Sequence, residues 1–300
     1  MNKYQSKVPL KTRLYNLLRR FFRLRFLENK LMKLTDEKNN SHLVRKLIPP
    51  NYLYPKGSYR TFDKGGIKLN LDISNEIDHG LYFNYKDAGQ EKLFELVKSD
   101  MVIIDVGVNI GTTILKFAKY AENGKVIGFE PDIEMYAKAK KNIALNNFKN
   151  ILLIDKGLGN ETMRLKLYRV HENNPGMNRI LDSGQIDCNY DFTEIEVIKL
   201  DDFTRDNNIE KIDLIKIDVE GYEFNVIQGG IEVLKKMRPI FFVELVDRNL
   251  RENNTSEEQL VRFFENYNYQ VFRADNNMPV TSKDNLNACH YDIICHRTII

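Results

Sequence analysis

The chain has 300 residues, of which 42% are hydrophobic and 29% are charged, and its formal net charge is +3. This composition excludes a largely disordered protein, and the length is sufficient for one large core or two small ones. The three cysteines, Cys188, Cys289 and Cys295, form no CxxC pair and no even set. The sequence therefore predicts neither a disulfide framework nor a zinc site, and it favours a reducing, cytoplasmic location.

Positive charge is concentrated at the N-terminal end. Residues 1–48 contain 13 Lys and Arg against 3 Asp and Glu, which gives +10; subtraction from the totals of 45 and 42 leaves 32 against 39, or −7, for residues 49–300. Lys or Arg interrupts every apolar run of the first segment, so we expect no secretory signal and no transmembrane helix. The acidic remainder carries no recognised nucleic-acid motif, and no nucleic-acid partner is expected.

A basic amphipathic helix is predicted over residues 10–34, because apolar side chains recur there in steps of three and four. One interpretation is a peripheral helix on the anionic inner surface of a membrane, or one that binds near a lipid-linked substrate. The other, slightly favoured by the sequence, is a helix packed on the catalytic core or on a second copy in a homo-oligomer. The apolar stripe consists of Leu10, Leu14, Leu17, Phe21, Leu24, Leu27, Leu31 and Leu34, and Arg19, Arg20, Arg23, Arg25 and Lys30 lie among them.

Two adjacent prolines, Pro49 and Pro50, predict a boundary between a helical extension (1–48) and a second unit (49–300), since proline ends a helix. A hairpin is expected within residues 60–83. From residue 90 onward the segments alternate between the helical and the strand period, which predicts a doubly wound, mostly parallel α/β sheet. The predicted helices are 90–98, 112–121, 133–147, 222–236 and 256–267, and the predicted strands are 101–106, 126–130, 151–154, 163–168, 194–200, 212–217, 239–245, 269–273 and 291–296.

One long stretch, residues 171–192, is rich in Asn, Asp and Gly and shows no period. Stretches of this length inside a domain are usually functional or flexible. It is a candidate lid over an acceptor, and a tolerated surface insertion is an equally good interpretation.

A glycine-containing loop, DVGVNIG at 105–111, follows an apolar strand, and a second strand ends in Glu130. This arrangement is typical of a βαβ unit that binds an adenosine compound, because glycines allow close backbone approach and Glu130 can accept hydrogen bonds from both ribose hydroxyls. The spacing differs from the G-x-G-x-x-G of pyrophosphate loops and fits S-adenosylmethionine, with Asp105 near the ammonium group of the cofactor. The predicted cofactor-binding residues are Asp105, Gly107, Asn109, Gly111, Glu130, Pro131 and Asp155.

A second charged group, Lys216, Asp218 and Glu220, stands at alternate positions around the end of the strand 212–217. An extended chain would place all three on one side, at the edge where open α/β sheets bind ligands. Asp218 or Glu220 is the predicted general base, with Lys216 stabilising the ionised carboxylate; a purely structural network is the alternative. Glu244 ends the following strand and is expected to orient the others. No metal is predicted, although Asp218 and Glu244 have the right chemistry for Mg²⁺ or Mn²⁺.

Five strings resemble the FkbM-type methyltransferases in order and spacing, over about residues 80–250: 105–111, FEP at 129–131, LDDF at 200–203, KIDVEGYE at 216–223, and RP at 238–239 followed by Glu244. Val108 and Tyr222 stand where that family commonly has alanine. The resemblance implies a class I, Rossmann-like fold that uses S-adenosylmethionine to O-methylate a hydroxyl of a sugar, glycan or polyketide-type metabolite. Two other classes stay open: a non-catalytic cofactor-binding or membrane-associated scaffold, and an NAD-dependent oxidoreductase, which the loop spacing disfavours.

Overall fold

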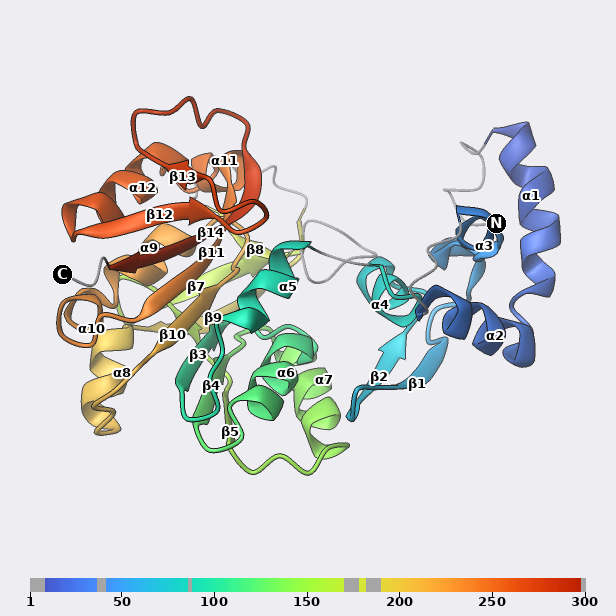
Figure 1. The fold of residues 1–300 in the computed structure, drawn as a ribbon, viewed down its shortest axis with the longest axis horizontal. Coiled ribbons are helices and arrows are strands. Elements are labelled where there is room, and N and C mark those ends of the chain that lie inside the picture. The colour runs from blue at the N-terminus through green and yellow to red at the C-terminus, as the bar shows by residue number, and fades with distance from the viewer. Residues whose placement is uncertain (1–8, 37–41, 86–87, 170–177, 182–189, 298–300) are drawn as a thin grey trace. The chain divides into compact units, whose positions relative to one another are not determined.

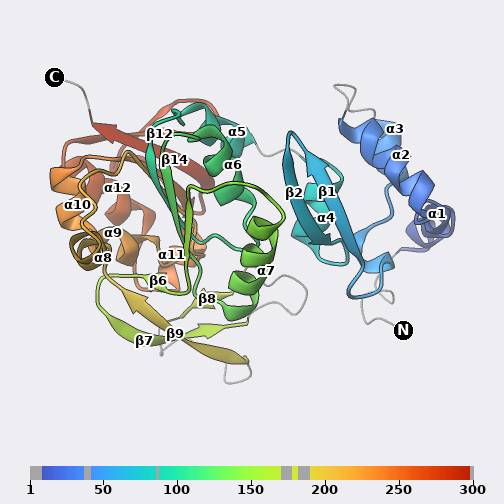
Figure 2. The same ribbon diagram turned by 90° about the horizontal axis from the view of Figure 1, so that it is seen from below.

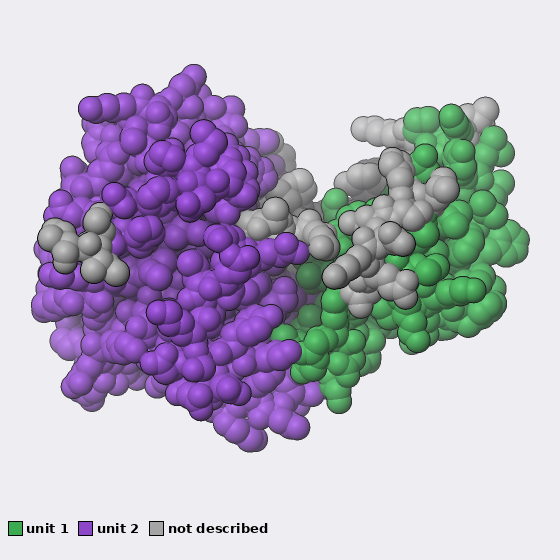
Figure 3. Space-filling view, viewed as in Figure 1, with its two compact units in different colours: residues 1–86 green, residues 87–300 purple. Residues whose placement is uncertain are grey.

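The computed structural model describes residues 9–36, 42–85, 88–169, 178–181 and 190–297. The chain forms two compact units, Met1–Lys86 and Asp87–Ile300 (Figure 3). This division lies further along the chain than the boundary that Pro49 and Pro50 predict. None of the described helices is both long and apolar enough to cross a bilayer.

The first unit contains helices and a two-stranded hairpin (Figures 1 and 2). Its elements are α1 (Leu10–Phe21), α2 (Arg25–Asp36), α3 (His42–Leu47), the 3₁₀ turn η2 (Asn51–Leu53), β1 (Tyr59–Lys64), β2 (Ile67–Asp72) and α4 (Glu76–Tyr82). The hairpin is antiparallel, as predicted. The single helix predicted over 10–34 is instead two helices, separated by a turn at residues 22–24.

A buried carboxylate explains why the hairpin belongs with the N-terminal helices. The side chain of Glu28 on α2 is fully buried, and it accepts hydrogen bonds from Arg60 Nε on β1 at 2.5 Å and from the Tyr82 hydroxyl of α4 at 3.3 Å. A buried charge is costly unless it is paired. Both of these hydrogen-bond donors come from beyond residue 48, so a unit that ended there would keep only the ion pair with Arg25 Nη1, at 4.0 Å, and lose both hydrogen bonds to Glu28.

The second unit is built on an eight-stranded sheet with the order β13-β12-β14-β11-β10-β3-β4-β5. The five strands from β11 to β5 are parallel, and β14 is antiparallel to both of its neighbours. Figure 2 shows α6 and α7 on one face of this sheet and α9 and α10 on the other. The predicted doubly wound, mostly parallel α/β fold is confirmed. The strands are β3 (Val102–Val106), β4 (Lys125–Phe129), β5 (Ile151–Ile154), β10 (Leu214–Ile217), β11 (Ile240–Val246), β12 (Tyr269–Arg273), β13 (Pro279–Val280) and β14 (His290–Arg297), and the helices are α5 (Ala88–Glu95), α6 (Thr112–Tyr120), α7 (Ile133–Ala144), α8 (Leu200–Asp206), α9 (Glu223–Gln228), α10 (Ile231–Lys236), α11 (Asp247–Arg251) and α12 (Glu257–Asn266).

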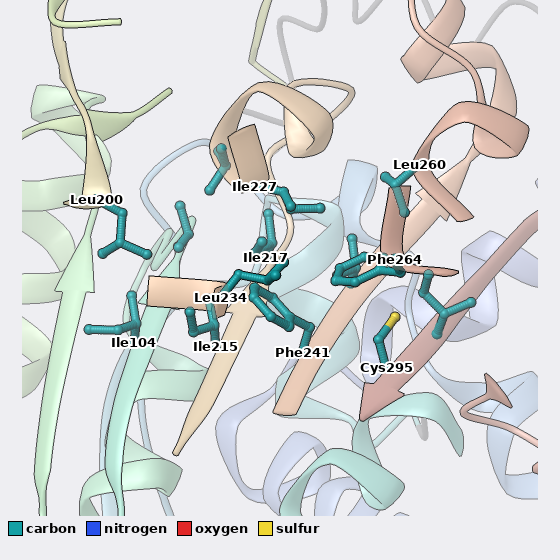
Figure 4. Close-up of a cluster of buried hydrophobic side chains, with 14 of the residues drawn as sticks. Ile104, Leu200, Ile215, Ile217, Ile227, Leu234, Phe241, Leu260, Phe264 and Cys295 are labelled. Carbon is teal, nitrogen blue, oxygen red and sulfur yellow. The ribbon is translucent and has the colours of Figure 1, made fainter. Parts of the chain in front are cut away.

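A continuous apolar core fixes the central strands (Figure 4). Ile104, Ile215 and Phe241 are register partners on β3, β10 and β11, and all three are buried. Leu234 and Phe264 cover them from α10 and α12. Burying each such side chain contributes about 1.5–3 kcal/mol to stability. This packing holds the ends of the central strands in fixed positions.

Two predicted features differ in the structure. The strands predicted at 163–168 and 194–200 form a separate sheet with the order β6-β9-β7-β8, made of β6 (Gly157–Leu158), β7 (Met163–Tyr168), β8 (Arg179–Ile180) and β9 (Phe192–Ile198). The helix predicted over 222–236 is divided into α9 and α10 at Gly229 and Gly230. A Cβ atom at Gly229 would overlap the carbonyl group of Gly159, so close contact with the segment after β6 requires glycine here.

Candidate functional site

The two predicted constellations meet at one edge of the large sheet. From β3 the chain continues outward to β4 and β5, whereas β10 leads to β11 and β14 on the other side. The carboxyl ends of the adjacent strands β3 and β10 therefore form a topological switch point, where open α/β sheets bind their ligands. Asp105 on β3 is the register partner of Lys216 on β10.

The glycine loop contacts the segment that follows β10. Gly107 has a φ of +81°, and a Cβ atom there would overlap the carbonyl oxygen of Asp218. Gly111, with a φ of +95°, is the N-cap residue of α6. On the other side, Asn142 of α7 donates from Nδ2 to the Ile110 carbonyl at 2.8 Å. Glycine is required at 107 both for backbone conformation and for close approach.

Gly107→Ala is expected to destabilise the second unit more than Gly111→Ala. Both positions have left-handed backbones, for which a Cβ atom costs about 1–2 kcal/mol. At Gly111, the Cβ would meet Ala139 at 3.4 Å, an ordinary contact, so only this strain applies. At Gly107, the overlap with Asp218 adds about 1–3 kcal/mol, as overpacking does. Urea unfolding of the second unit measures the loss of unfolding free energy in each variant. Equal losses in the two variants would show that the loop can move away from β10 without an energetic cost.

Glu130, which directly follows β4, binds the glycine loop. Its carboxylate is buried, accepting hydrogen bonds from the backbone N–H of Asn109 at 2.7 Å and of Asp132 at 3.0 Å. Burial raises the pKa of Glu130 to about 7, against the effect of these two N–H groups. Because a carboxylate offers about four acceptor positions, Glu130 has capacity left for ligand hydroxyls. Pro131 follows it and lies against Gly157.

Asp105 has unfilled hydrogen-bonding capacity. Its side chain is fully buried, and neither carboxylate oxygen has a hydrogen-bond partner among the described residues; Lys216 Nζ lies 3.5 Å from Oδ1. Burial raises the pKa of Asp105 to about 6, and the charge of Lys216 opposes the rise. Buried polar groups without partners are rare and costly. An acceptor in this position fits a ligand that carries an ammonium group, as S-adenosylmethionine does.

Asp155, the seventh predicted cofactor residue, is placed differently. It directly follows β5, one strand further out than Glu130, and its side chain is exposed. Within the described parts of the chain no hydrogen bond or ion pair connects it to the glycine loop. Its role in cofactor binding stays a prediction.

Lys216 connects the glycine loop to the acidic strand end. Its buried Nζ donates to the Gly107 carbonyl at 2.9 Å, and lies 3.2 Å from Asp218 Oδ2. Burial alone would lower the pKa of Lys216, but the charges of Asp218 and Asp105 outweigh it and raise the pKa, so the side chain is an ammonium ion. The Asp218 side chain is 43% exposed and can reach a bound molecule.

Glu220 comes close to Asp218 by a different route from the predicted one. β10 ends at Ile217, and Glu220 has a φ of +55°, so the alternation of an extended chain does not continue to it. Instead, Asn249 Nδ2 donates to Glu220 Oε2 at 2.9 Å. Carboxylate oxygens of Asp218, Glu220 and Glu244 lie within 4.8 Å of one another. Burial, followed by the charge of Asp218, raises the pKa of Glu220 to about 7, and burial also raises that of Glu244.

Two residues that contribute to the site, Arg179 and Asn249, were not predicted from the sequence. Arg179 on β8 is buried and donates from Nη1 to Asn249 Oδ1 at 2.9 Å and to Glu252 Oε2 at 2.7 Å; its Nη2 lies 3.8 Å from Glu220 Oε2. Arg179 belongs to the unpatterned stretch 171–192, which gave no local signal for it. Of that predicted lid, 171–177 and 182–189 lie outside the described residues, so the lid stays a prediction.

Comparison with known proteins identifies the same region. The family model described as Methyltransferase FkbM domain matches residues 105–271. The 2-O-methyltransferase NoeI of Sinorhizobium fredii (strain NBRC 101917 / NGR234) is 30% identical over 170 residues, which are 52% of this chain and 68% of the relative. Methyltransferase 1 of Beauveria bassiana (strain ARSEF 2860) is 25% identical over 165 residues, 49% of this chain and 66% of the relative. Among solved structures, M. jannaschii TYW2 in complex with AdoMet gives a TM-score of 0.44 at 15% identity, covering 82% of this chain and 89% of that one.

The family match begins at Asp105 and includes the glycine loop, Glu130 and the strand end with Lys216 and Asp218. It confirms the resemblance seen in the sequence, and with it S-adenosylmethionine as the cofactor. Since the match covers more than half of its length, the chain belongs to the FkbM methyltransferase family.

Proposed function

We propose that this protein transfers a methyl group from S-adenosylmethionine to a hydroxyl oxygen of a sugar, glycan or related metabolite. The observation that carries the proposal is the partly exposed cluster of Asp218, Glu220 and Glu244 directly beside the glycine loop. A hydroxyl acceptor must lose a proton, and a carboxylate within reach of it is a suitable base. The name of NoeI, a 2-O-methyltransferase, supports oxygen as the methylated atom.

The cofactor, when bound, supplies an electrophilic methyl group on a sulfonium centre. The protein would position the two reactants: the loop at 107–111 and Glu130 would hold the adenosine part, and Asp105 would accept from the ammonium group. Holding the acceptor oxygen in line with the methyl group can provide most of the rate enhancement. Asp218 or Glu220 then accepts the hydroxyl proton. Lys216 forms an ion pair with Asp218, and Asn249 fixes the orientation of Glu220.

The rate is expected to fall as the pH decreases through about 7. Burial raises the pKa of Glu220 to about 7, and a general base works only in its deprotonated form. The charge of Asp218 contributes to this raised pKa, so Asp218→Asn should move the acid limb of the residual activity to lower pH. The measurement is kcat against pH at saturating cofactor, which removes the effect of Glu130 and Asp105 on cofactor binding. A pH-independent kcat between pH 5 and 8, the interval around this pKa, would contradict Glu220 as the base.

The proposal is tested by turnover. The full chain is incubated with S-adenosylmethionine and a panel of monosaccharides, oligosaccharides and other hydroxyl compounds, in EDTA and again with Mg²⁺, and products are analysed by mass spectrometry. We expect an O-methylated product in EDTA. Methylation of nitrogen or carbon alone would overturn the acceptor proposal. Cofactor binding with no product on any acceptor would favour the scaffold alternative. A strict requirement for Mg²⁺ would show that the carboxylate cluster binds a metal ion. The cytoplasmic location and a homo-oligomeric state stay predictions from the sequence.

A further inference from the structure

Helix α1 packs against its own unit through polar side chains. Asn16 is buried and donates from Nδ2 to the Tyr52 hydroxyl at 3.1 Å. Arg19 donates from Nε to the Lys46 carbonyl at 2.8 Å and from Nη1 to Asn16 Oδ1 at 3.2 Å. Positions 12, 16 and 19 lie on one face of a helix, and all three are at least partly buried. The polar face of α1 is therefore the face that contacts the rest of the first unit.

The apolar face of α1 points away from these contacts. Leu14, Leu17, Leu18 and Phe21 are 62%, 56%, 49% and 65% exposed, at the i, i+3, i+4, i+7 spacing of a single face. Two more apolar residues, which follow α1 in the chain, are also exposed: Leu24 at 52% and Phe26 at 68%. These six residues are called the exposed apolar face. In contrast, Leu31, further along the predicted stripe, is buried in the unit. Contiguous exposed apolar surface of this kind marks an interaction site.

The charge around this face is entirely positive. Residues 10–26 contain six basic side chains, Lys11, Arg13, Arg19, Arg20, Arg23 and Arg25, and no Asp or Glu. Lys11, Arg20 and Arg25 are exposed. A helix that combines a wide apolar face with Lys and Arg complements a surface that is apolar below and anionic above. The headgroup and acyl boundary of an anionic bilayer has this arrangement.

We propose that the exposed apolar face binds the surface of an anionic lipid bilayer, with Lys11, Arg20 and Arg25 at the phosphate level. The 12 residues of α1 extend about 18 Å, less than the roughly 30 Å of a hydrocarbon core, so the helix lies in the interface and does not cross it. This inference goes beyond the proposed methyl transfer and does not depend on it.

Vesicle cosedimentation of the full chain tests the proposal without substrate or turnover. Binding is measured on phosphatidylcholine vesicles with and without phosphatidylserine. The wild type should bind only the anionic vesicles, and Leu17→Glu with Phe21→Glu should weaken binding at least about tenfold. Both side chains are exposed, so the fold should persist, which a thermal melt checks. The matched control is Met278→Glu, another exposed apolar position at 59%, and it should bind like the wild type.

The charges are tested separately. The double substitution Lys11→Gln with Arg20→Gln removes two of them and should weaken binding to anionic vesicles. Added salt should also weaken this binding, since it screens exposed charges. Light scattering without lipid reports the oligomeric state of each variant. Three results would overturn the proposal: no vesicle binding by the wild type, equal binding to neutral vesicles, or unchanged binding by the Leu17 and Phe21 variant. A dimer that this variant converts to monomer, without any lipid binding, would identify the face as a contact between copies.

Discussion

Asp218→Asn and Glu220→Gln are expected to leave the fold and the cofactor affinity nearly unchanged, while at least one of them lowers kcat by about two to four orders of magnitude. Each substitution preserves side-chain shape and removes the ability to accept a proton. Asn249 can still donate to an amide oxygen at position 220, as it now does to Glu220 Oε2 at 2.9 Å. The measurement is single-turnover methyl transfer to the acceptor found with the wild type, together with calorimetry of cofactor binding.

The matched control is Glu258→Gln on α12, whose half-exposed carboxylate pairs with Arg262 on the same helix. It should turn over like the wild type. If Asp218→Asn and Glu220→Gln also reach the wild-type rate, positioning alone carries the catalysis. These residues would then form a structural network around Lys216.

Glu130→Ala is expected to weaken S-adenosylmethionine binding by about 2 to 4 kcal/mol, taking hydrogen bonds to charged groups at their usual strength. The structure gives two reasons. The substitution removes the proposed acceptor for the ribose hydroxyls, and it also leaves the N–H groups of Asn109 and Asp132 without the carboxylate that now fixes the loop. Glu130→Gln should lose less, because its amide oxygen can still accept one of these bonds.

Glu134→Ala is the control for this substitution, since Glu134 lies on the following helix with an exposed carboxylate paired to Arg169 at 3.1 Å. Calorimetry should show wild-type affinity for it. A Glu130→Ala protein that keeps both its fold and the wild-type affinity would remove Glu130 from the cofactor site.

The parts of the structure that the sequence predicted are those with a local pattern. Apolar period and chain order gave the parallel sheet, and an acid after each of two strands located Asp105 and Glu130 at its carboxyl edge. The glycine spacing identified Gly107, whose neighbour is Asp218, directly after a strand that lies more than 100 residues further along the chain. The sequence indicates that glycine is needed at 107, but it does not reveal that the Asp218 carbonyl is the group that requires it.

The parts that the sequence could not predict depend on contacts between distant segments. Arg179 on β8 and Asn249 on α11 are far apart in the sequence, and only the folded chain brings them to Glu220. The left-handed backbone at Glu220 also lacks a local signal, since glycine or asparagine is the usual residue for it. The N-terminal stripe predicted one apolar face along one helix, whereas α1 and α2 are separate helices; which face of α1 packs is decided by Asn16 and Arg19, whose partners lie in η2 and α3.

Calorimetric titration of the wild-type protein with S-adenosylmethionine, its demethylated product and NAD tests the account most directly. We predict saturable, one-to-one binding of the first two and no heat with NAD, because the loop at 105–111 offers an acid for an ammonium group where a dinucleotide needs a pyrophosphate site. Saturable binding of NAD, with no heat from S-adenosylmethionine or its product, would contradict the assignment of this site.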